Sequence, residues 1–338
     1  MNRESIFFVL FVSMSLLSCS NDVQVDEVSV FERQLLVNDN HYLIKGICYH
    51  PVAIGSSERS FETIDKDLAL MVEAGINTIR VYAPIDNVNV LDKIDAAGLK
   101  VIIGIGYNQD GFYDMVSGSF IDYVNKYKNH NAILMWELGN EYNYHPEWFE
   151  GDLKNWYNDM NVAADLIHKA DSKHPVTTAH GDLPDALALS LSPNIDVWGM
   201  NVYRWVEPES IFSEWKAVSS KPMYLSETGG DSYMTVSAEG YEQGENQKAQ
   251  ADANKIILEK SFDDKGICSG VTLFSFTDGW WKAGQNDVQD IGGTAPNSSG
   301  VPYDRDPNEE YWGIVDIHRN KKETFNVVKE IYLSQKKN

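Results

Sequence analysis

The chain has 338 residues, with 28 Lys and Arg against 50 Asp and Glu and a formal net charge of -22 at pH 7. An acidic surface of this kind argues against nucleic acid or an anionic lipid surface as a partner, and a polymeric ligand is expected to be neutral or weakly charged. Once the N-terminal segment described next is set aside, roughly 310 residues remain, which is enough for one large domain core.

The N-terminus has the pattern of an export signal. Arg3 precedes an apolar run from Ile6 to Leu17, which is too short to be a permanent transmembrane helix. The run ends in Leu-Leu-Ser-Cys at Cys19, which resembles the lipobox of bacterial lipoproteins, whose cysteine becomes the lipidated first residue. An ordinary signal peptide with an incidental cysteine is the alternative. We expect residues 1–18 to be the signal and 19–30 a tether, so that the exported domain is attached to a bacterial membrane by its lipid anchor only.

Two further cysteines, Cys48 and Cys268, remain in the exported chain. On the strand assignment below, Cys48 lies near the top of the first barrel strand and Cys268 just below the eighth. These strands are neighbours in a closed barrel, but the two side chains stand at opposite ends, too far apart for a disulfide. We expect both to be buried, reduced thiols. The chain shows no Cys/His spacing typical of a metal site, and we expect no metal and no cofactor.

From residue 31 onward the chain alternates between expected strands and helices. A short strand at 31–36 is expected to plug or flank the main fold. Eight main strands, identified by apolar runs and the turn residues that follow them, are expected at 42–48, 78–82, 100–106, 132–141, 175–178, 195–203, 223–226 and 270–276. Helices, identified by apolar residues at helical spacing, are expected at 60–74, 87–97, 153–170, 245–260 and 323–333. A long loop, 277–311, follows the last strand, and loops of this length are usually functional.

This alternation predicts a single (β/α)8 barrel over residues 31–338. Glu141 and Glu227 close the fourth and seventh units, and their separation of 86 positions (227 − 141) gives about 29 residues per unit, close to the roughly 30 of a strand-helix-strand step. A doubly wound open sheet is the structural alternative. It is disfavoured because no Gly-x-Gly-x-x-Gly follows the first strand, and Gly104-Ile-Gly106 lies inside a strand and lacks the third glycine.

Two of the predicted strands deliver a glutamate at their C-terminal ends. The run from Ala132 to Trp136 is apolar, as in a strand buried on both faces, and it leads to Gly139, Asn140 and Glu141. Glu227 ends the seventh strand in the same way. The C-terminal ends of the strands carry the active site in barrels of this fold. Because the fourth and seventh strands face each other across the barrel mouth, the two glutamates form a candidate pair for cleaving a glycosidic bond with retention of configuration.

Five segments carry a resemblance to a known group of enzymes. Trp136-Glu-Leu-Gly-Asn-Glu141 and Leu225-Ser-Glu-Thr-Gly229 resemble the signatures of clan A glycoside hydrolases, retaining barrels with catalytic glutamates on strands 4 and 7. Gly75-Ile-Asn-Thr-Ile-Arg-Val-Tyr82, Trp198-Gly-Met-Asn-Val-Tyr203 and Tyr311-Trp-Gly-Ile-Val-Asp316 extend the match. Together these segments are similar to the barrel of glycoside hydrolase family 2 and to the fungal β-1,3-glucanosyltransferases of family 72. The resemblance covers nearly the whole chain after the export signal.

The resemblance implies roles for particular side chains. Glu141 is similar in position to the acid/base and Glu227 to the nucleophile. Asn140 would contact the substrate 2-hydroxyl group, Arg80 would hold the nucleophile ionised, and Tyr203 would donate a hydrogen bond to the nucleophile from the sixth strand. The alternative for Arg80 is a purely structural ion pair. The alternative for Tyr203 is a packing role, with its hydroxyl group hydrogen-bonded to the backbone.

The resemblance also places His50, His180 and Trp280 in the wall of the sugar pocket. Each has an ordinary alternative, because a histidine at a strand end is often a satisfied polar residue and a tryptophan is often a core side chain. Glu137 competes with Glu141 for the role of acid, since it lies on the same face of the strand four positions earlier. The Gly-Asn pair before Glu141 favours the latter, and we expect Glu137 to pair with a neighbour in a lower layer of the barrel.

Some features depart from these families. Family 2 enzymes typically have β-sandwich domains ahead of the barrel, and we expect this chain to have no room for them. The glucanosyltransferases carry extra cysteines that are missing here. Trp136-Glu-Leu also resembles the β-mannanases of family 5, although the sixth strand lacks the histidine expected there. These departures leave the sugar and its linkage open.

The sequence thus predicts a retaining β-glycoside hydrolase that acts on a β-linked glucan or a related oligo- or polysaccharide by double displacement. Transglycosylation is a variant of the same prediction, since it shares the glycosyl-enzyme intermediate and differs in the acceptor. The alternatives are a β-mannanase-like endo-hydrolase, a non-catalytic carbohydrate-binding lipoprotein and a metal-dependent hydrolase on the same fold. Whether cleavage is endo or exo, and the oligomeric state, are not predicted.

Overall fold

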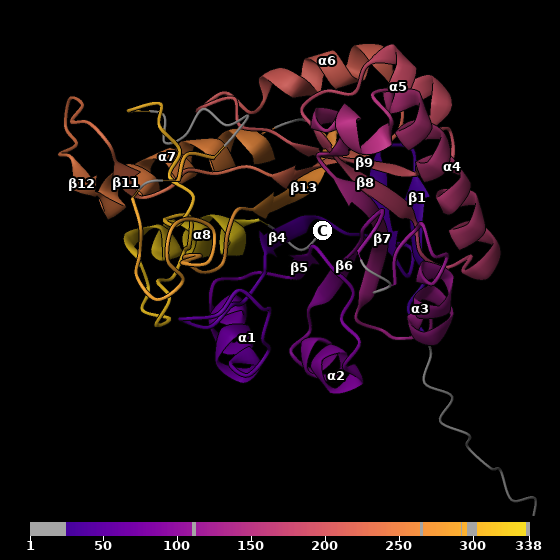
Figure 1. The fold of residues 1–338 in the computed structure, drawn as a ribbon, viewed down its shortest axis with the longest axis horizontal. Coiled ribbons are helices and arrows are strands. Elements are labelled where there is room, and N and C mark those ends of the chain that lie inside the picture. The colour runs from indigo at the N-terminus through magenta and orange to yellow at the C-terminus, as the bar shows by residue number, and fades with distance from the viewer. Residues whose placement is uncertain (1–24, 110–112, 264–265, 292, 296–302, 336–338) are drawn as a thin grey trace, which may run out of the picture.

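The computed structural model describes residues 25–109, 113–263, 266–291, 293–295 and 303–335 (Figure 1). The predicted signal peptide at 1–18 and residues 19–24 of the predicted tether, including the predicted lipidation site Cys19, lie outside the described residues. In the part of the chain that is described, no helix combines the length and the apolar character needed to cross a membrane.

Eight parallel strands close into a barrel in the order β10-β13-β4-β5-β6-β7-β8-β9 (Figure 1). Their bounds are β4 (Ile44–Cys48), β5 (Thr78–Val81), β6 (Lys100–Ile105), β7 (Ile133–Asn140), β8 (Val176–Gly181), β9 (Val197–Asn201), β10 (Met223–Glu227) and β13 (Cys268–Leu273). Each of the eight predicted strands corresponds to one of these, and the prediction of a single (β/α)8 barrel is confirmed. The strands are buried almost throughout, which explains their continuous apolar runs.

Helices surround this barrel (Figure 1). Their bounds are α1 (Ile64–Glu73), α2 (Val88–Ala96), α3 (Phe120–Tyr127), α4 (Leu153–Ala170), α5 (Ala186–Leu191), α6 (Ser210–Val218), α7 (Gln247–Phe262) and α8 (Glu323–Ser334). The N-terminus of α4 is capped by Asp152, whose side chain accepts a hydrogen bond from the Lys154 N–H group, and Asn246 caps α7 in the same way at Ala249. Asn87 caps α2 at Asn89, whereas α1 and α8 begin without a side-chain cap.

A small antiparallel sheet covers the N-terminal end of the barrel. It consists of β1 (Val28–Phe31), β2 (Gln34–Val37) and β3 (Asn40–His41). Val28 and Leu35 are buried in a cluster with barrel side chains that include Ile44, Ile102 and Leu134. The segment predicted to plug or flank the barrel therefore closes its lower end, and it leaves the C-terminal end open for a site.

The two described cysteines behave as predicted. Cys48 ends β4 and Cys268 begins β13, so they stand at opposite ends of neighbouring strands. Both are buried thiols that form no disulfide.

The connection after β13 is long and irregular. Among its described residues, from Phe274 to Lys322, there is no helix and no regular strand. It lies over the C-terminal end of the barrel together with a short hairpin, β11 (Tyr233–Met234) and β12 (Gly244–Glu245), which extends beyond α7 at the left of Figure 1. This matches the long loop predicted at 277–311 and provides one wall of the cavity described next.

Candidate active site

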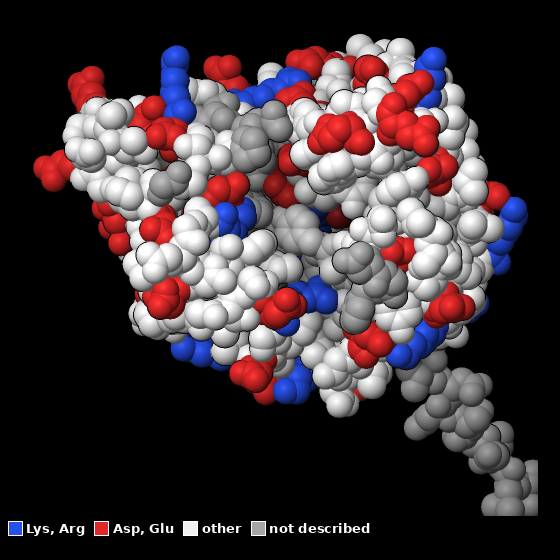
Figure 2. Space-filling view, in the orientation of Figure 1, with Lys and Arg blue, Asp and Glu red and all other residues white. Residues whose placement is uncertain are grey.

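A cavity of about 360 Å³ opens at the C-terminal end of the barrel strands. Figure 2 shows this face hollowed near its middle, with acidic side chains in the depth of the hollow. The cavity is lined by residues from the ends of β4, β5, β7, β9 and β10 and from the connection after β13. They are Cys48, His50, Tyr82, Asn140, Glu141, Tyr203, Glu227, Phe274, Ser275, Phe276, Thr277, Gly279, Trp281, Lys282, Ala295, Glu309 and Trp312.

The end of β7 turns sharply to present Glu141 to the cavity. Gly139 has φ 69°, and a Cβ atom there would lie 2.7 Å from the Trp156 ring, so the position requires glycine on both counts. Glu141 itself has φ 56°, a left-handed conformation that is unfavourable for this residue type, and its N–H group donates to the Ala179 carbonyl 2.8 Å away. Strained backbone held in place by its surroundings is typical of functional sites.

Glu227 ends β10 and is surrounded by hydrogen-bond donors. Its Oε1 atom accepts from Arg80 Nη1 at 2.8 Å and from the Tyr82 hydroxyl at 2.7 Å. Its Oε2 atom accepts from the Tyr203 hydroxyl at 2.9 Å. One cationic and two phenolic donors suit an ionised carboxylate that acts as an acceptor at every contact.

Arg80 connects the cavity floor to the barrel interior. Its guanidinium group is fully buried and forms a two-point contact with Glu137, with Nε to Oε2 and Nη2 to Oε1 both 2.8 Å. Burial alone would lower the pKa of Arg80, but the carboxylates of Glu137 and Glu227 raise it well above its usual range. Glu137 also accepts a hydrogen bond from the Tyr224 hydroxyl at 2.9 Å and does not line the cavity. Glu137 therefore lies in the lower layer with a partner, as the sequence predicted.

Replacing Arg80 by Leu should destabilise the protein strongly. The change leaves Glu137 and Glu227 buried without their cation, and breaking a buried pair on one side costs about 3–5 kcal/mol. Urea unfolding followed by circular dichroism measures this loss. The control is Lys93→Met, which breaks an exposed ion pair with Asp65 and should cost less than about 1 kcal/mol. Equal losses in the two variants would contradict a central role for Arg80 in holding the site together.

Glu141 sits in a different electrostatic environment from Glu227. Burial, and then the nearby charge of Glu227, raise the pKa of Glu141 to about 7, although a hydrogen bond with Asn201 acts in the opposite direction. At neutral pH a large fraction of Glu141 is therefore protonated. Two carboxyl groups in one cavity, one protonated and one bound by donors, match the requirement for a proton donor beside a nucleophile.

Asn140 lines the cavity and is held by Arg80 and Asn201. Its Oδ1 atom accepts from Arg80 Nη2 at 2.7 Å and from Asn201 Nδ2 at 3.1 Å, and Asn201 is itself fixed by the Ser226 hydroxyl at 2.7 Å. Because both contacts use the carbonyl oxygen, they fix the plane of the Asn140 amide and identify its Nδ2 group as the donor for a hydroxyl group in the cavity.

His50 lines the cavity, as predicted, whereas two other predicted wall residues do not. Burial, followed by the charges of Arg59 and Lys282, lowers the pKa of His50 to about 4, so this histidine is neutral at pH 7. His180 is 7% exposed and does not line the cavity, and its Nε2 atom lies 3.2 Å from the Tyr157 hydroxyl. The prediction of His180 as a wall residue is therefore wrong, because the histidine is satisfied by neighbours inside the fold.

Trp280 is also absent from the wall. Its ring meets that of His318 edge-on, with 6.1 Å between ring centroids. The next residue, Trp281, lines the cavity and packs against His50 at 4.9 Å between centroids. The prediction of Trp280 was thus wrong by one position, because the loop path decides which of two consecutive side chains turns inward.

The structure adds residues that the sequence prediction missed. Tyr82 contacts Glu227 directly, and a signal for it existed, since it follows Arg80 by two positions and therefore shares its face of the strand. Trp312, Lys282 and Glu309 come from the long connection, where no periodic pattern indicates which side chains turn inward. Within the described residues, no group of three or more His, Cys, Asp and Glu side chains is arranged to hold a metal ion.

Residues 28–252 match the family model described as the TIM barrel domain of glycosyl hydrolases family 2. A relative by sequence is the probable beta-glucosidase btgE of Aspergillus flavus, 24% identical over 297 residues, which cover 80% of this chain and 42% of the relative. Another is a beta-glucuronidase of Bacteroides fragilis, 27% identical over 124 residues, which cover 32% of this chain and 18% of the relative. This chain therefore spans less than half the length of the curated relatives it matches.

Solved structures share the fold. The GH2 beta-galacturonidase from Eisenbergiella tayi bound to galacturonate has a TM-score of 0.67 and 22% identity, with 92% of this chain and 54% of that chain covered. The beta-glucuronidase of Faecalibacterium prausnitzii has a TM-score of 0.68 and 19% identity, with 92% and 52% covered. The family model supports the resemblance to family 2, the solved structures share the fold, and the resemblance to the family 72 glucanosyltransferases is not shown.

Proposed function

Since the chain belongs to family 2 of the glycosyl hydrolases, through the TIM barrel domain of that family, we propose that it is a retaining β-glycoside hydrolase with Glu227 as nucleophile and Glu141 as acid/base. The observation that carries the proposal is the pair of carboxyl groups in one cavity with contrasting environments. Glu227 accepts hydrogen bonds from Arg80, Tyr82 and Tyr203, while the pKa of Glu141 is raised to about 7.

In the first step, a carboxylate oxygen of Glu227 attacks the anomeric carbon while Glu141 gives its proton to the departing glycosidic oxygen. The C–O bond to the leaving group breaks, and an ester bond to Glu227 forms. We assign the attack to Oε2, because Arg80 and Tyr82 hold Oε1, which becomes the carbonyl oxygen of the ester. The Tyr203 hydroxyl orients Oε2 before the attack.

In the second step, Glu141 is ionised and removes a proton from a water molecule, which attacks the anomeric carbon and releases Glu227. A sugar hydroxyl group in place of water gives transglycosylation. Asn140 donates to the 2-hydroxyl group of the bound sugar, a contact that strengthens in the transition state. Two displacements return the anomeric carbon to its original β configuration.

The proposed substrate is a β-linked glucan or a related polysaccharide. Aromatic side chains supply much of the cavity wall, among them Tyr82, Trp281 and Trp312, and aromatic faces suit the apolar faces of sugar rings. The chain carries a net charge of -22, which disfavours a strongly anionic polymer. The relatives by sequence are a probable beta-glucosidase and a beta-glucuronidase, so a glucose-type ring is the expected starting point.

The test is a screen of the protein on laminarin, mannan, mixed-linkage β-glucan, xylan and aryl β-glycosides, with the products followed by proton NMR. We expect cleavage of a β-glucan or a β-glucoside, and the β anomer as the first product. A first product in the α configuration would contradict the double displacement. Binding without cleavage on every sugar would instead support a non-catalytic carbohydrate-binding protein.

A further inference from the structure

We propose that the ion pair between Lys282 and Glu309 restricts the site to uncharged sugars and excludes uronic acids. This inference rests on the proposed glycosidase function and specifies its substrate class. It is not what the structural neighbours suggest, because those described above are a beta-galacturonidase and a beta-glucuronidase. At an identity of 22% or less, these matches show a shared fold and do not identify the sugar. The sugar must therefore be inferred from the charges in the cavity.

Lys282 and Glu309 both line the cavity and are in direct contact. Their side chains are 23% and 18% exposed, so they are largely shielded from solvent. The Lys282 ammonium group also lies 4.5 Å from the centre of the Phe274 ring, which is itself part of the cavity wall. Lys282 thus already has both an anionic partner and an aromatic face.

The segments that carry this pair are fixed by contacts from below. The Glu310 carboxylate accepts hydrogen bonds from the N–H groups of Ala283, at 3.2 Å, and Asp290, at 2.5 Å. Glu310 follows Glu309 directly in the chain, so its hydrogen bonds attach the turn after Lys282 to the segment that carries Glu309. With both ends of the pair attached to the same anchor, Lys282 is not expected to swing toward a ligand.

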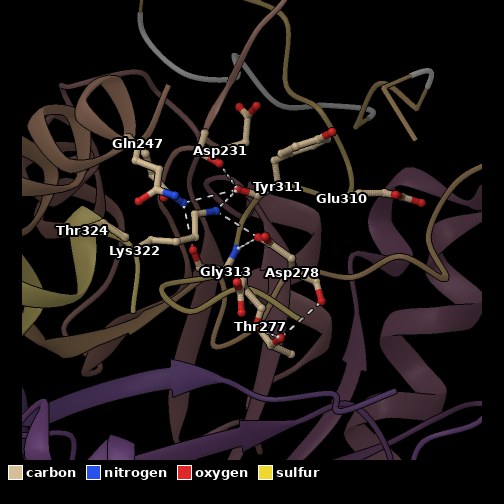
Figure 3. A network of polar contacts seen from close by, with 12 residues as sticks. Asp231, Gln247, Thr277, Asp278, Glu310, Tyr311, Gly313, Lys322 and Thr324 are labelled. Atoms are coloured by element: carbon tan, nitrogen blue, oxygen red, sulfur yellow. Dashed lines mark hydrogen bonds and ion pairs between the residues drawn. The ribbon is translucent and has the colours of Figure 1, made fainter. Parts of the chain in front are cut away.

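A second, buried ion pair joins Lys322 to Asp278 in the same part of the chain (Figure 3). Lys322 Nζ is 3.0 Å from Asp278 Oδ1, and it also donates to the Tyr311 carbonyl at 3.0 Å. Asp278 in turn accepts from the Gly313 N–H group at 2.9 Å. These contacts join the chain before Lys282 to the chain after Glu309, so the geometry of the cavity pair is set by the surrounding fold.

The remaining charges in the cavity are unfavourable for a sugar carboxylate. Three glutamates line it, namely Glu141, Glu227 and Glu309, against a single lysine among the described lining residues. Arg80 lies beneath the cavity and is already bound to Glu137 and Glu227. A uronate would therefore place another carboxylate beside Glu227 and Glu309, and among the described lining residues it would find no cation without a carboxylate partner. Like charges at short range reject a ligand.

The experiment compares matched substrates that differ at C6 alone. We expect kcat/KM for 4-nitrophenyl β-glucoside to exceed that for the β-glucuronide by roughly 100-fold or more, and the galactoside and galacturonide to show the same order. Glu309→Gln removes one negative charge and releases Lys282, so the neutral-to-uronide ratio should fall by about tenfold, which corresponds to about 1.4 kcal/mol. Lys282→Met should leave the ratio as high as before or raise it.

A control separates this local effect from the change in net charge. Glu259→Gln, on the exposed face of α7, alters the total charge as Glu309→Gln does and should not change the ratio. A wild-type preference for the uronides, or an unchanged ratio in Glu309→Gln, would overturn the inference while leaving the glycosidase function standing.

A binding measurement covers the case in which no glycoside is cleaved, which would refute the proposed function itself. Trp281 and Trp312 line the cavity, so their fluorescence reports on its occupancy. Glucose should then bind more tightly than glucuronate to the wild-type protein, and Glu309→Gln should reduce the difference. Tighter binding of glucuronate, or no binding of the neutral sugar, would overturn the charge inference independently of turnover.

Discussion

Replacing Glu227 by Ala is expected to abolish turnover, with kcat reduced by about 10⁴-fold or more. The variant lacks the group that forms the glycosyl ester, and Glu137 cannot take its place, since it does not line the cavity and is bound to Arg80. Initial rates on an aryl β-glycoside measure the loss. A residual activity above a few per cent would exclude Glu227 as the nucleophile.

Azide should restore activity to Glu227→Ala and change the stereochemistry of the product. The anion fits the space left by the carboxylate, attacks the anomeric carbon once and displaces the leaving group. A single displacement gives an α-glycosyl azide, which NMR distinguishes from the β product of the native enzyme. Tyr203→Phe serves as the control, because it removes a hydrogen bond to Glu227 but keeps the nucleophile, so azide should not alter its product. A β-glycosyl azide would contradict the assignment.

The barrel could be predicted from the sequence because its signals are strong and repeated. Strands such as β6 and β7 are rich in apolar residues and lead to a glycine, Gly106 or Gly139, and α4 has a clear apolar stripe with Asp152 as its cap. The helices that the prediction missed are α3, α5 and α6, which are eight, six and nine residues long. At this length an apolar segment such as Ala-Leu-Ala-Leu-Ser-Leu in α5 has no period that separates a helix from a strand.

The inner part of the candidate site could be predicted because it lies at the ends of strands. The structure brings Arg80, Asn140, Glu141, Tyr203 and Glu227 together around one cavity or directly beneath it. The catalytic roles proposed for Glu141 and Glu227 are tested by the variants of these two residues.

The outer wall could not be predicted in the same way. Whether Trp280 or Trp281 faces inward depends on the path of an irregular loop, and contacts such as Asp278–Lys322 determine that path. The two residues of this ion pair are 44 positions apart, so no local pattern reveals them. The prediction of His180 was wrong for a different reason. A histidine at a strand end can find its hydrogen-bond partner inside the fold, and here that partner is Tyr157.

Replacing Glu141 by Ala should produce a loss that depends on the leaving group. The proton of Glu141 is needed most when the departing oxygen is strongly basic, as in a glucan, where we expect a loss of about 10²–10⁴-fold. A dinitrophenyl glycoside needs little protonation, so the first step on this substrate should be much less affected. Glu137→Gln is the matched control, since it alters the other glutamate of β7 and should show no dependence on the leaving group. If Glu137→Gln showed the steeper dependence, the acid assignment would be wrong.

The pH profile gives a second test of the same residue. The pKa of Glu141 is raised to about 7, mainly by burial, and the protonated form is the one that donates to the leaving oxygen. In the free enzyme, kcat/KM for a natural substrate should therefore fall as the pH rises through about 7, and this alkaline limb should disappear in Glu141→Ala. In Glu227→Gln, which lacks the nucleophile, the pKa of Glu141 itself should be lower than in the native protein when it is measured by NMR titration, because the neighbouring negative charge that raises this pKa is removed. An alkaline limb that persists in Glu141→Ala would mean that another group supplies the proton, since the ionisation of Glu141 could then not be its cause.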